Sequence, residues 1–307
     1  MMDKFYFVLF YCFRALVKIT PRKLLNPLLI MIADVVRFFD TKHRSIMMTN
    51  LNLAYEESLS LAQKEAIMKA AYRNLAFNGA DFVRNYPTTK EAILKKIRFE
   101  NEEIMHKALE SKRPIIFQTG HYGNWELVPL SLAARYGALS GIGRPLDSPM
   151  MNQIVRQNRE QLDIELIDKK GAMRPMLKAV KEGRNIGLLV DQNTSQKAGV
   201  IVKFFGKNVR HTPAASIMAR RVNGLIVPVF ISTNDHALYT LSFYEPIEVA
   251  NTENMEQDIL EATQAQANIM EAVIRAKPEE WFWFHRRWKG EHKSVYGVRK
   301  KRKKRDA

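Results

Sequence analysis

The feature that most constrains the fold is an alternation of apolar strands and amphipathic helices that begins near residue 114. Short apolar runs are separated by segments with three- and four-residue apolar periodicity, which is typical of helices packed on a sheet. The predicted strands cover residues 114–119, 138–142, 164–167, 185–190, 200–205, 225–232 and 238–244. The predicted helices cover residues 124–136, 149–162, 173–181, 213–222 and 255–275. This pattern predicts an α/β fold with a single mixed sheet flanked by helices.

The chain before this alternation is predicted to be helical. Residues 43–86 carry apolar side chains at helical spacing, with Ser60 as a cap and Pro87 at the end of the block. Residues 1–40 are apolar and punctuated by Lys and Arg, but the apolar runs 5–13 and 24–33 are too short for a bilayer span of roughly 20 residues. This composition favours a helical segment that associates with a membrane surface. The alternative is an ordinary amphipathic helix packed on the core.

The charge of the chain predicts an acidic partner. There are 48 Lys and Arg residues against 32 Asp and Glu residues, a formal net charge of +16. Without the last nine residues the balance is 41 against 31, so the body of the protein is itself basic at +10. Nucleic acid, an anionic membrane surface and an acidic protein or ligand all fit this charge. A single cysteine, Cys12, excludes a disulfide framework and a cysteine-based zinc site.

Residues 291–307 are predicted to be a basic, disordered tail. Seven consecutive cations occupy residues 299–305, and like charges with nothing to bury do not fold by themselves. Such a tail can bind anionic lipid head groups or nucleic-acid phosphates. The alternative is a solvated tail that aids solubility.

One strand-to-helix crossing carries residues suited to catalysis. The strand at 114–119 runs into Gly120-His-Tyr-Gly-Asn-Trp-Glu126, and ligands bind at this edge of open α/β sheets. A carboxylate bonded to one ring nitrogen of His121 fixes the tautomer, and the other nitrogen can then accept a proton from a hydroxyl. Glu126, five residues on, is the predicted partner. The alternative is that Glu126 only complements the helix dipole and His121 only satisfies the turn.

The sequence contains no common nucleotide-binding, esterase or zinc motif that would suggest a different active site. The sequence has no Gly-x-Gly-x-x-Gly opening a helix, no phosphate-binding Gly-Lys-Ser/Thr loop, no Gly-x-Ser-x-Gly elbow and no His-Glu-x-x-His pair. His211 and His285 lie beside arginines, where a structural role is the commoner one. The aromatic residues at 281–284 are predicted to pack in the core or an interface.

The sequence resembles the late acyltransferases of lipid A biosynthesis, the lauroyl/myristoyl transferase family of Gram-negative bacteria. The His-x4-Glu motif matches as His121 and Glu126, and further blocks follow in family order over about residues 43–289. These blocks are Arg144-Pro-Leu, the pair Arg156 and Arg159, Leu188-Leu-Val-Asp-Gln192, Phe204-Phe-Gly206, Thr212-Pro213 and Pro278-Glu-Glu-Trp-Phe-Trp-Phe-His-Arg-Arg-Trp-Lys289. The ordered set is far more specific than the motif alone.

The resemblance implies acyl transfer from an acyl carrier protein thioester to the hydroxyl of a 3-hydroxyacyl chain on a lipid A precursor of the Kdo2-lipid IVA type. It implies a glycerolipid acyltransferase-like domain at 41–290, no metal or redox cofactor, and a place on the cytoplasmic face of the bacterial inner membrane. In this reading His121 is the general base, oriented by Glu126. The expected substrate-binding residues are Arg159, Arg144, Arg156, Asp191, Gln192 and Asn124. Asp191 is expected to position an arginine or the substrate.

Several alternatives stay open. A glycerophospholipid acyltransferase shares the chemistry but usually carries Phe-Pro-Glu-Gly-Thr where this chain has Val190-Asp-Gln192. A family member that acylates another glycolipid or an amino-acid lipid fits equally well. A nucleic-acid-binding protein would need interleaved aromatic residues on a basic face, and no specific nucleic-acid partner is predicted. A catalytically inactive membrane scaffold is a further alternative.

Overall fold

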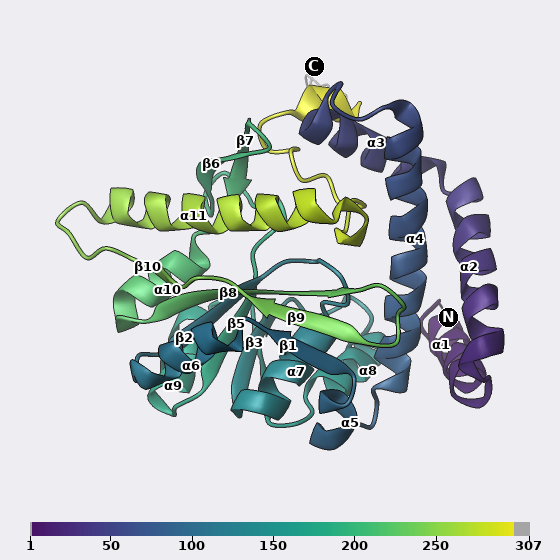
Figure 1. Ribbon diagram of the computed structural model, residues 1–307, viewed down its shortest axis with the longest axis horizontal. Helices are drawn as coiled ribbons and strands as arrows, with labels where there is room; N and C mark the ends of the chain where they lie inside the picture. Colours follow the sequence, from purple (N-terminus) through teal and green to yellow (C-terminus); the bar gives the residue numbers. More distant parts are fainter. Residues whose placement is uncertain (1, 298–307) are drawn as a thin grey trace, which may run out of the picture.

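The computed structural model describes residues 2–297, and the alternation seen in the sequence folds into a central sheet with helices on both faces (Figure 1). The helices are α1 (Met2–Ile19), α2 (Arg22–Phe39), α3 (Thr41–Tyr55), α4 (Leu61–Arg84), α5 (Lys90–Leu94), α6 (Glu102–Glu110), α7 (Leu127–Tyr136), α8 (Pro149–Arg159), α9 (Met173–Lys181), α10 (Ala214–Val222) and α11 (Met255–Ala276), with 3-10 turns η1 (Pro278–Glu280) and η2 (Lys293–Tyr296). The strands are β1 (Ile97–Glu100), β2 (Ile115–Thr119), β3 (Leu139–Gly143), β4 (Ile164–Asp168), β5 (Asn185–Leu189), β6 (Val200–Phe204), β7 (Lys207–His211), β8 (Leu225–Thr233), β9 (Tyr239–Phe243) and β10 (Ile247–Glu248).

The main sheet is mixed, as predicted. Its strand order is β1-β9-β8-β2-β5-β3-β4, with β10 paired to β8. β8 is antiparallel to β9 and β10, and the other neighbours are parallel. Because β2 and β5 are parallel neighbours, with Thr119 opposite Leu189, their carboxyl ends lie at the same edge of the sheet. This edge is where the sequence placed the candidate site.

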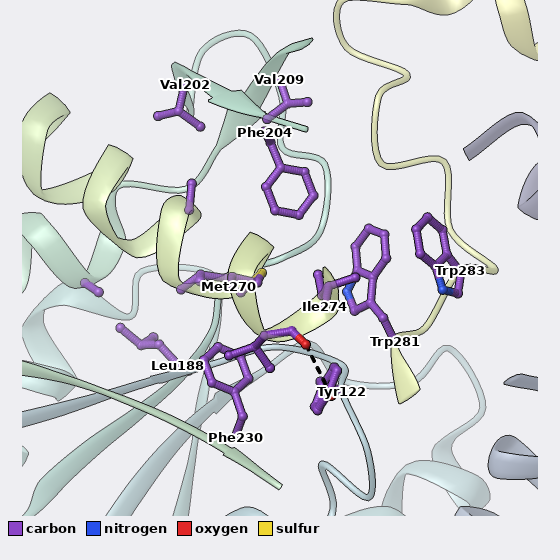
Figure 2. Close-up of a cluster of buried hydrophobic side chains, with 14 of the residues drawn as sticks. Tyr122, Leu188, Val202, Phe204, Val209, Phe230, Met270, Ile274, Trp281 and Trp283 are labelled. Atoms are coloured by element: carbon purple, nitrogen blue, oxygen red, sulfur yellow. Dashed lines mark hydrogen bonds between the residues drawn. The ribbon is translucent and has the colours of Figure 1, made fainter. Parts of the chain in front are cut away.

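The strand predicted at 200–205 does not join the main sheet. β6 pairs antiparallel with β7, and the two form a separate two-stranded sheet. Figure 2 shows the hairpin residues Val202, Phe204 and Val209 on one side of α11 and the sheet residues Leu188 and Phe230 on the other. α11 is therefore covered on two sides, and the hairpin closes the core over it.

The two faces of the main sheet bury different clusters. The face toward α11 belongs to the largest cluster, which includes three fully buried tryptophans, Trp281, Trp283 and Trp288. The opposite face packs on α7, and Phe117 of β2 and Leu132 of α7 are typical members of that second cluster. In Figure 1, α11 lies above the sheet and α7 below it.

The predicted helical block at 43–86 is two helices, α3 and α4. The break has a physical cause, because Ser60 caps α4 in a reciprocal capping box with Gln63 and starts a new helix there. α4 then runs along one end of the sheet (Figure 1). Leu25 and Leu29 of α2 are fully buried against the far side of α4.

The outer faces of α1 and α2 carry many exposed apolar side chains. These are Tyr6, Val8, Leu9, Tyr11, Ile19, Leu24, Met31, Ile32, Val35, Val36, Phe38 and Phe39. Within residues 2–297, no helix combines the length and the hydropathy needed to cross a bilayer.

The folded chain continues past the boundary predicted at residue 290. Lys293–Tyr296 forms the turn η2, and the Tyr296 hydroxyl donates to Asn50 of α3. The same hydroxyl accepts a hydrogen bond from the Trp288 main chain at 3.2 Å. The rest of the predicted tail, 298–307, lies outside the described residues.

Candidate active site

The loop after β2 depends on two glycines that bring main chain into close contact. Gly123 has φ +56°, and a Cβ there would lie 1.8 Å from the carbonyl oxygen of Ile231. A Cβ on Gly120 would lie 3.2 Å from Cγ of Asp191 and 3.1 Å from Cε of Met270. Gly123 is therefore required by the turn, and Gly120 lets Asp191 approach the loop.

Main-chain hydrogen bonds attach this loop to the segment after α11. The Gly123 N–H donates to the Glu280 carbonyl at 2.9 Å, and the Phe282 N–H donates to the His121 carbonyl at 2.9 Å. Asn78 of α4 adds a bond from its Nδ2 to the Gly123 carbonyl at 2.7 Å. The main chain that carries His121 is thus held by two elements distant in sequence, which fixes the position of the ring.

Asp191 holds the His121 ring. Its Oδ1 lies 2.7 Å from His121 Nδ1, and its Oδ2 accepts from the His121 main-chain N–H at 3.0 Å. The same Oδ2 accepts from Trp281 Nε1 at 3.0 Å. Asp191 has no exposed surface, since it follows β5 at the sheet edge beneath the loop. A proton on Nδ1 shared with this carboxylate leaves Nε2 as the basic nitrogen. Gln192 Nε2 lies 3.4 Å from His121 Nε2.

The electrostatics of this pair favour the charged forms. Burial is the largest influence on both groups, raising the pKa of Asp191 and lowering the pKa of His121. The attraction and hydrogen bond between them outweigh burial, so the pKa of Asp191 lies well below 3.8 and that of His121 above 6.5. The charge of Glu126 also raises the pKa of His121, and Arg159 lowers it.

The expected bond between Glu126 and the His121 ring is not formed, and this prediction is corrected. Glu126 accepts two hydrogen bonds from Arg159, with Nε to Oε2 at 2.8 Å and a terminal nitrogen to Oε1 at 2.5 Å. A bidentate guanidinium is a geometrically complementary partner for a carboxylate, so it occupies both oxygens of Glu126. Of the two contacts expected of Asp191, the one to an arginine is not formed, because its oxygens accept from His121 and Trp281.

A cavity of about 1090 Å³ opens beside the His121 ring at the carboxyl edge of β2, β3 and β5. Its polar wall includes six residues that a substrate head group could contact: His121, Glu126, Arg144, Arg159, Lys169 and Gln192. One part of its apolar wall lies between the sheet and α7 and includes Phe117, Val128, Leu132, Leu139, Ile164 and Leu166. Another part belongs to the core on the opposite face of the sheet and includes Met176, Leu188 and Val190. The combination suits an amphiphilic ligand whose polar part stays near the opening.

The other predicted residues divide between the cavity and its surroundings. Arg144 lines the cavity and is mostly exposed, with Asp147 at 3.1 Å. Arg156 is not among the lining residues and pairs with Glu160, the residue that follows α8. The substrate contact predicted for it has no support in its position.

Asn124, which was also expected to bind substrate, is not among the residues that line the cavity. It is 1% exposed, and its Nδ2 lies 3.3 Å from Asp81 and 3.4 Å from the Tyr239 hydroxyl. Asn124 is therefore a buried link between the loop and α4.

The sequence reasoning missed three aromatic residues of the site. Trp281, predicted only to pack, also donates to Asp191. The rings of Trp125 and Phe282 lie 5.3 Å and 5.9 Å from the His121 ring, centroid to centroid. Trp125 stands in the motif itself, which was a usable signal. Phe282 lies 161 positions after His121 in the sequence, and its main-chain hydrogen bond to His121 brings the two rings close.

His285 and His211 are structural in this arrangement. Burial lowers the pKa of His285 to about 4 and that of His211 to about 3, with Arg287 adding to the effect at both. Within residues 2–297, no three His, Cys, Asp or Glu side chains gather in a way that could hold a metal ion.

Comparisons with known proteins place the chain in a family. The model of the family described as bacterial lipid A biosynthesis acyltransferase matches residues 1–290. The phosphatidylinositol mannoside acyltransferase of Mycolicibacterium smegmatis is 23% identical over 59% of this chain. The lipid A biosynthesis lauroyltransferase of Escherichia coli is 26% identical over 58% of it. The matches span 59% and 57% of the length of these two relatives.

A solved structure, the 1-acyl-sn-glycerophosphate acyltransferase of Thermotoga maritima, covers 82% of this chain and 98% of its own, at 14% identity and a TM-score of 0.35. The family match extends over nearly the whole chain and includes the loop after β2, the residues that follow β5 and the aromatic segment after α11. The chain belongs to the bacterial lipid A biosynthesis acyltransferase family.

Proposed function

We propose that this protein transfers an acyl chain from an acyl carrier protein thioester to the hydroxyl of a 3-hydroxyacyl chain on a lipid A precursor, of the Kdo2-lipid IVA type. The observation that carries the proposal is the imidazole of His121, held by Asp191 beside a large cavity with an apolar interior. Family membership supports the reaction class. The donor, the acceptor and the roles of individual residues are parts of the proposal.

His121 is the general base in this mechanism. Nε2 takes the proton of the acceptor hydroxyl as its oxygen bonds to the thioester carbonyl carbon. Asp191 keeps the second proton on Nδ1 and stabilises the imidazolium that forms. When the tetrahedral intermediate collapses, the carbon–sulfur bond breaks and the imidazolium returns the proton to the leaving thiolate. The products are the new ester and the free thiol of the carrier.

Cations at the cavity opening are suited to a phosphorylated acceptor. Arg144, Lys169 and Arg174 line the cavity at its exposed rim, and Arg159 has N–H donors beyond the two that Glu126 accepts. A guanidinium binds phosphate oxygens through paired N–H groups. In the proposal these residues bind the acceptor phosphates, and Arg159 also stabilises the oxyanion of the intermediate.

The exposed apolar faces of α1 and α2 support a place on a membrane. Large apolar side chains there stand beside the cations Arg14 and Lys18, a composition typical of interfacial helices. The acceptor is a membrane lipid, so the proposed site of action is the cytoplasmic face of the bacterial inner membrane. The net charge of +16 suits both this anionic surface and the acidic acyl carrier protein.

One relative supports a second class of acceptor lipid as an alternative. The phosphatidylinositol mannoside acyltransferase of Mycolicibacterium smegmatis matches the chain about as well as the lauroyltransferase does. A glycolipid other than a lipid A precursor is therefore the alternative acceptor, with the same base and the same type of donor.

The test incubates the full-length protein, extracted from membranes, with lauroyl- or myristoyl-acyl carrier protein. Mass spectrometry then measures the lipid products. Tetra- and penta-acylated lipid A precursors and a phosphatidylinositol mannoside are offered in parallel. We expect the lipid A precursor to gain one acyl chain, and His121→Ala to lower the rate by at least about 100-fold. His292→Ala is the matched control, since His292 does not line the cavity and its side chain bonds a main-chain carbonyl at 3.2 Å.

Each outcome separates the proposals. Gain of mass only on the mannoside establishes the second acceptor class and rejects the first. A His121→Ala variant that is folded and fully active rejects the base. No transfer to any acceptor from either donor rejects the reaction.

A further inference from the structure

The part of the cavity that lies between the sheet and α7 has an unusual floor, made by glycines on two adjacent strands. Gly187 of β5 lies opposite Gly141 of β3 in the sheet register. Phe117 of β2 lies on the other side of Gly187, and Leu166 of β4 on the other side of Gly141. One row across four strands therefore reads Phe, Gly, Gly, Leu, and the middle of the row has no side chains.

This row faces α7. Side chains alternate between the two faces of a sheet, and Phe117 belongs to the cluster that packs on α7. Leu139 and Ile164 lie two residues earlier on β3 and β4, point to the same face and belong to the same cluster. The missing side chains therefore leave a trough between the sheet and α7. Gly141 and Gly187 both line the cavity, so the cavity extends into this trough.

The fold does not require glycine at either position. Neither residue has a positive φ, unlike Gly123. A Cβ on Gly187 would lie 3.7 Å from its nearest neighbour, Leu139 Cδ1, and a Cβ on Gly141 would lie 3.5 Å from Leu166 Cδ2, which are ordinary contacts. At Gly224, by contrast, a Cβ would lie 2.5 Å from Ile116 Cδ1.

Glycine in a strand interior weakens the strand and often marks a place where a ligand comes close. β5 is an interior strand of the sheet, yet Gly187 is only partly buried, because the cavity exposes it. Since neither backbone conformation nor packing accounts for these two glycines, space for a ligand does.

The shape and chemistry of the trough fit a hydrocarbon chain. Its walls are Phe117, Val128 and Leu132, and Leu139 and Ile164 stand at its inner end. From Gly143 at the opening to Leu139 at the inner end, β3 rises about 13 Å. Polar groups are concentrated at the opening, beside the His121 ring. The trough is thus an apolar slot that starts beside the His121 ring.

We propose that Gly141 and Gly187 form the floor of the slot that holds the acyl chain being transferred, and that they set the longest chain the protein accepts. This inference rests on the proposed acyl transfer and adds the residues that determine donor length. A side chain at either position fills the slot from below, and the inner end is then closed to the last carbons of a long chain.

The experiment compares Gly187→Val and Gly141→Val with the wild type. Valine suits a strand, and at each position its side chain lies on the face of the sheet that the cavity lines. Gly79→Val is the matched control, because a Cβ on Gly79 of α4 would meet no atom within 4 Å. Acyl carrier proteins bearing octanoyl to palmitoyl chains compete for one acceptor, and mass spectrometry counts the products. Separately, calorimetry measures binding of the free fatty acids of the same lengths to each variant.

We expect both slot variants to shift the preferred donor to a shorter chain, by about two carbons or more. Each methylene that loses its place in the slot lowers the preference about fourfold. The fatty-acid affinities are expected to follow the same order. The Gly79→Val profile is expected to match that of the wild type.

The two readouts separate this inference from the proposed function. If no transfer occurs but the valine variants shorten the fatty acids that bind, the slot is established and the proposed reaction is wrong. If the wild type transfers acyl chains and both folded valine variants keep its length profile, the slot is wrong. An equal shift in Gly79→Val also overturns it.

Discussion

The two carboxylates beside His121 lie in opposite surroundings. Asp191 is fully buried, and its oxygens accept from the His121 ring, the His121 main chain and the Trp281 indole. Glu126 lies in the cavity wall, and Arg159 occupies both of its oxygens. Only the first carboxylate contacts the ring. The second acts on it through charge, across a distance.

This difference shows that the carboxylate at the motif spacing, Glu126, is not the one that is hydrogen-bonded to the His121 ring. A carboxylate bonded to Nδ1 fixes the tautomer, the orientation and the basicity of the imidazole together. A carboxylate neutralised by a bidentate arginine fixes the arginine and adds a weaker electrostatic influence. Substitutions of Asp191 and Glu126 should therefore have different effects on catalysis.

The largest effect is expected for Asp191→Asn. An amide at this position can donate to Nδ1 and hold the wrong tautomer, so kcat/KM should fall by about 10³–10⁴-fold. Glu126→Gln should cost about tenfold, mainly in KM, because Arg159 loses its partner and the cavity wall loosens. Steady-state acyl transfer measures both variants. Circular dichroism confirms that they are folded, and equal losses in kcat would contradict the assignment of Asp191 as the residue that orients His121.

The next effect is on the pH profile. A general base works only when neutral, so kcat/KM should rise with pH through the His121 pKa, which lies above 6.5. Removing the Asp191 charge lowers this pKa, so the acid limb of Asp191→Asn should move to lower pH. Glu126→Gln should move it the same way by less, since its charge contributes after that of Asp191. If the acid limb of the Glu126→Gln profile moved further than that of Asp191→Asn, Glu126 would be the carboxylate with the stronger influence on the His121 pKa.

A smaller effect is expected for Trp281→Phe, which removes one donor from Asp191 and keeps most of the aromatic contact. A hydrogen bond to a charged group contributes about 1.5–3 kcal/mol, so the free energy of unfolding should fall by about that amount. The transfer rate should fall by less than in Asp191→Asn, because the bond to His121 Nδ1 remains. Denaturant unfolding and rate measurements test the two parts. Trp283→Phe is the comparison, because that indole donates only to the Pro278 carbonyl.

Much of the fold could be predicted because burial leaves a local signature in the sequence. β2 and β8 begin with apolar runs and are buried almost throughout, and their predicted limits agree with the structure to within one residue. β1 was missed because only Ile97 and Phe99 face inward, and such a short alternation gives little signal. The strand predicted at 200–205 was assigned to the main sheet because sequence order does not reveal which strands are neighbours, and its partner β7 was not predicted.

The same limit explains what was missed in the site. His121 could be found from its own surroundings, since glycines and a strand end mark the loop. Asp191 lies 70 residues away, and its contact with His121 exists because β5 is placed next to β2. The bond from Trp281 depends on the segment after α11 folding back over the loop. These contacts follow from topology, and no local pattern contains them.

The smallest effect is expected for Arg156→Ala, set against Arg159→Ala on the same helix. Arg156 lies outside the cavity in an exposed pair with Glu160, and pairs of this kind contribute about 0–1 kcal/mol. Its removal should leave KM for the acceptor unchanged. Arg159→Ala should raise that KM by about tenfold or more, because it frees Glu126 inside the cavity and removes a cation from the wall. Titration of the acceptor at saturating donor measures both. If Arg156→Ala raised KM as much as Arg159→Ala, the acceptor would have to extend over the outer face of α8, and the cavity alone would not define where it binds.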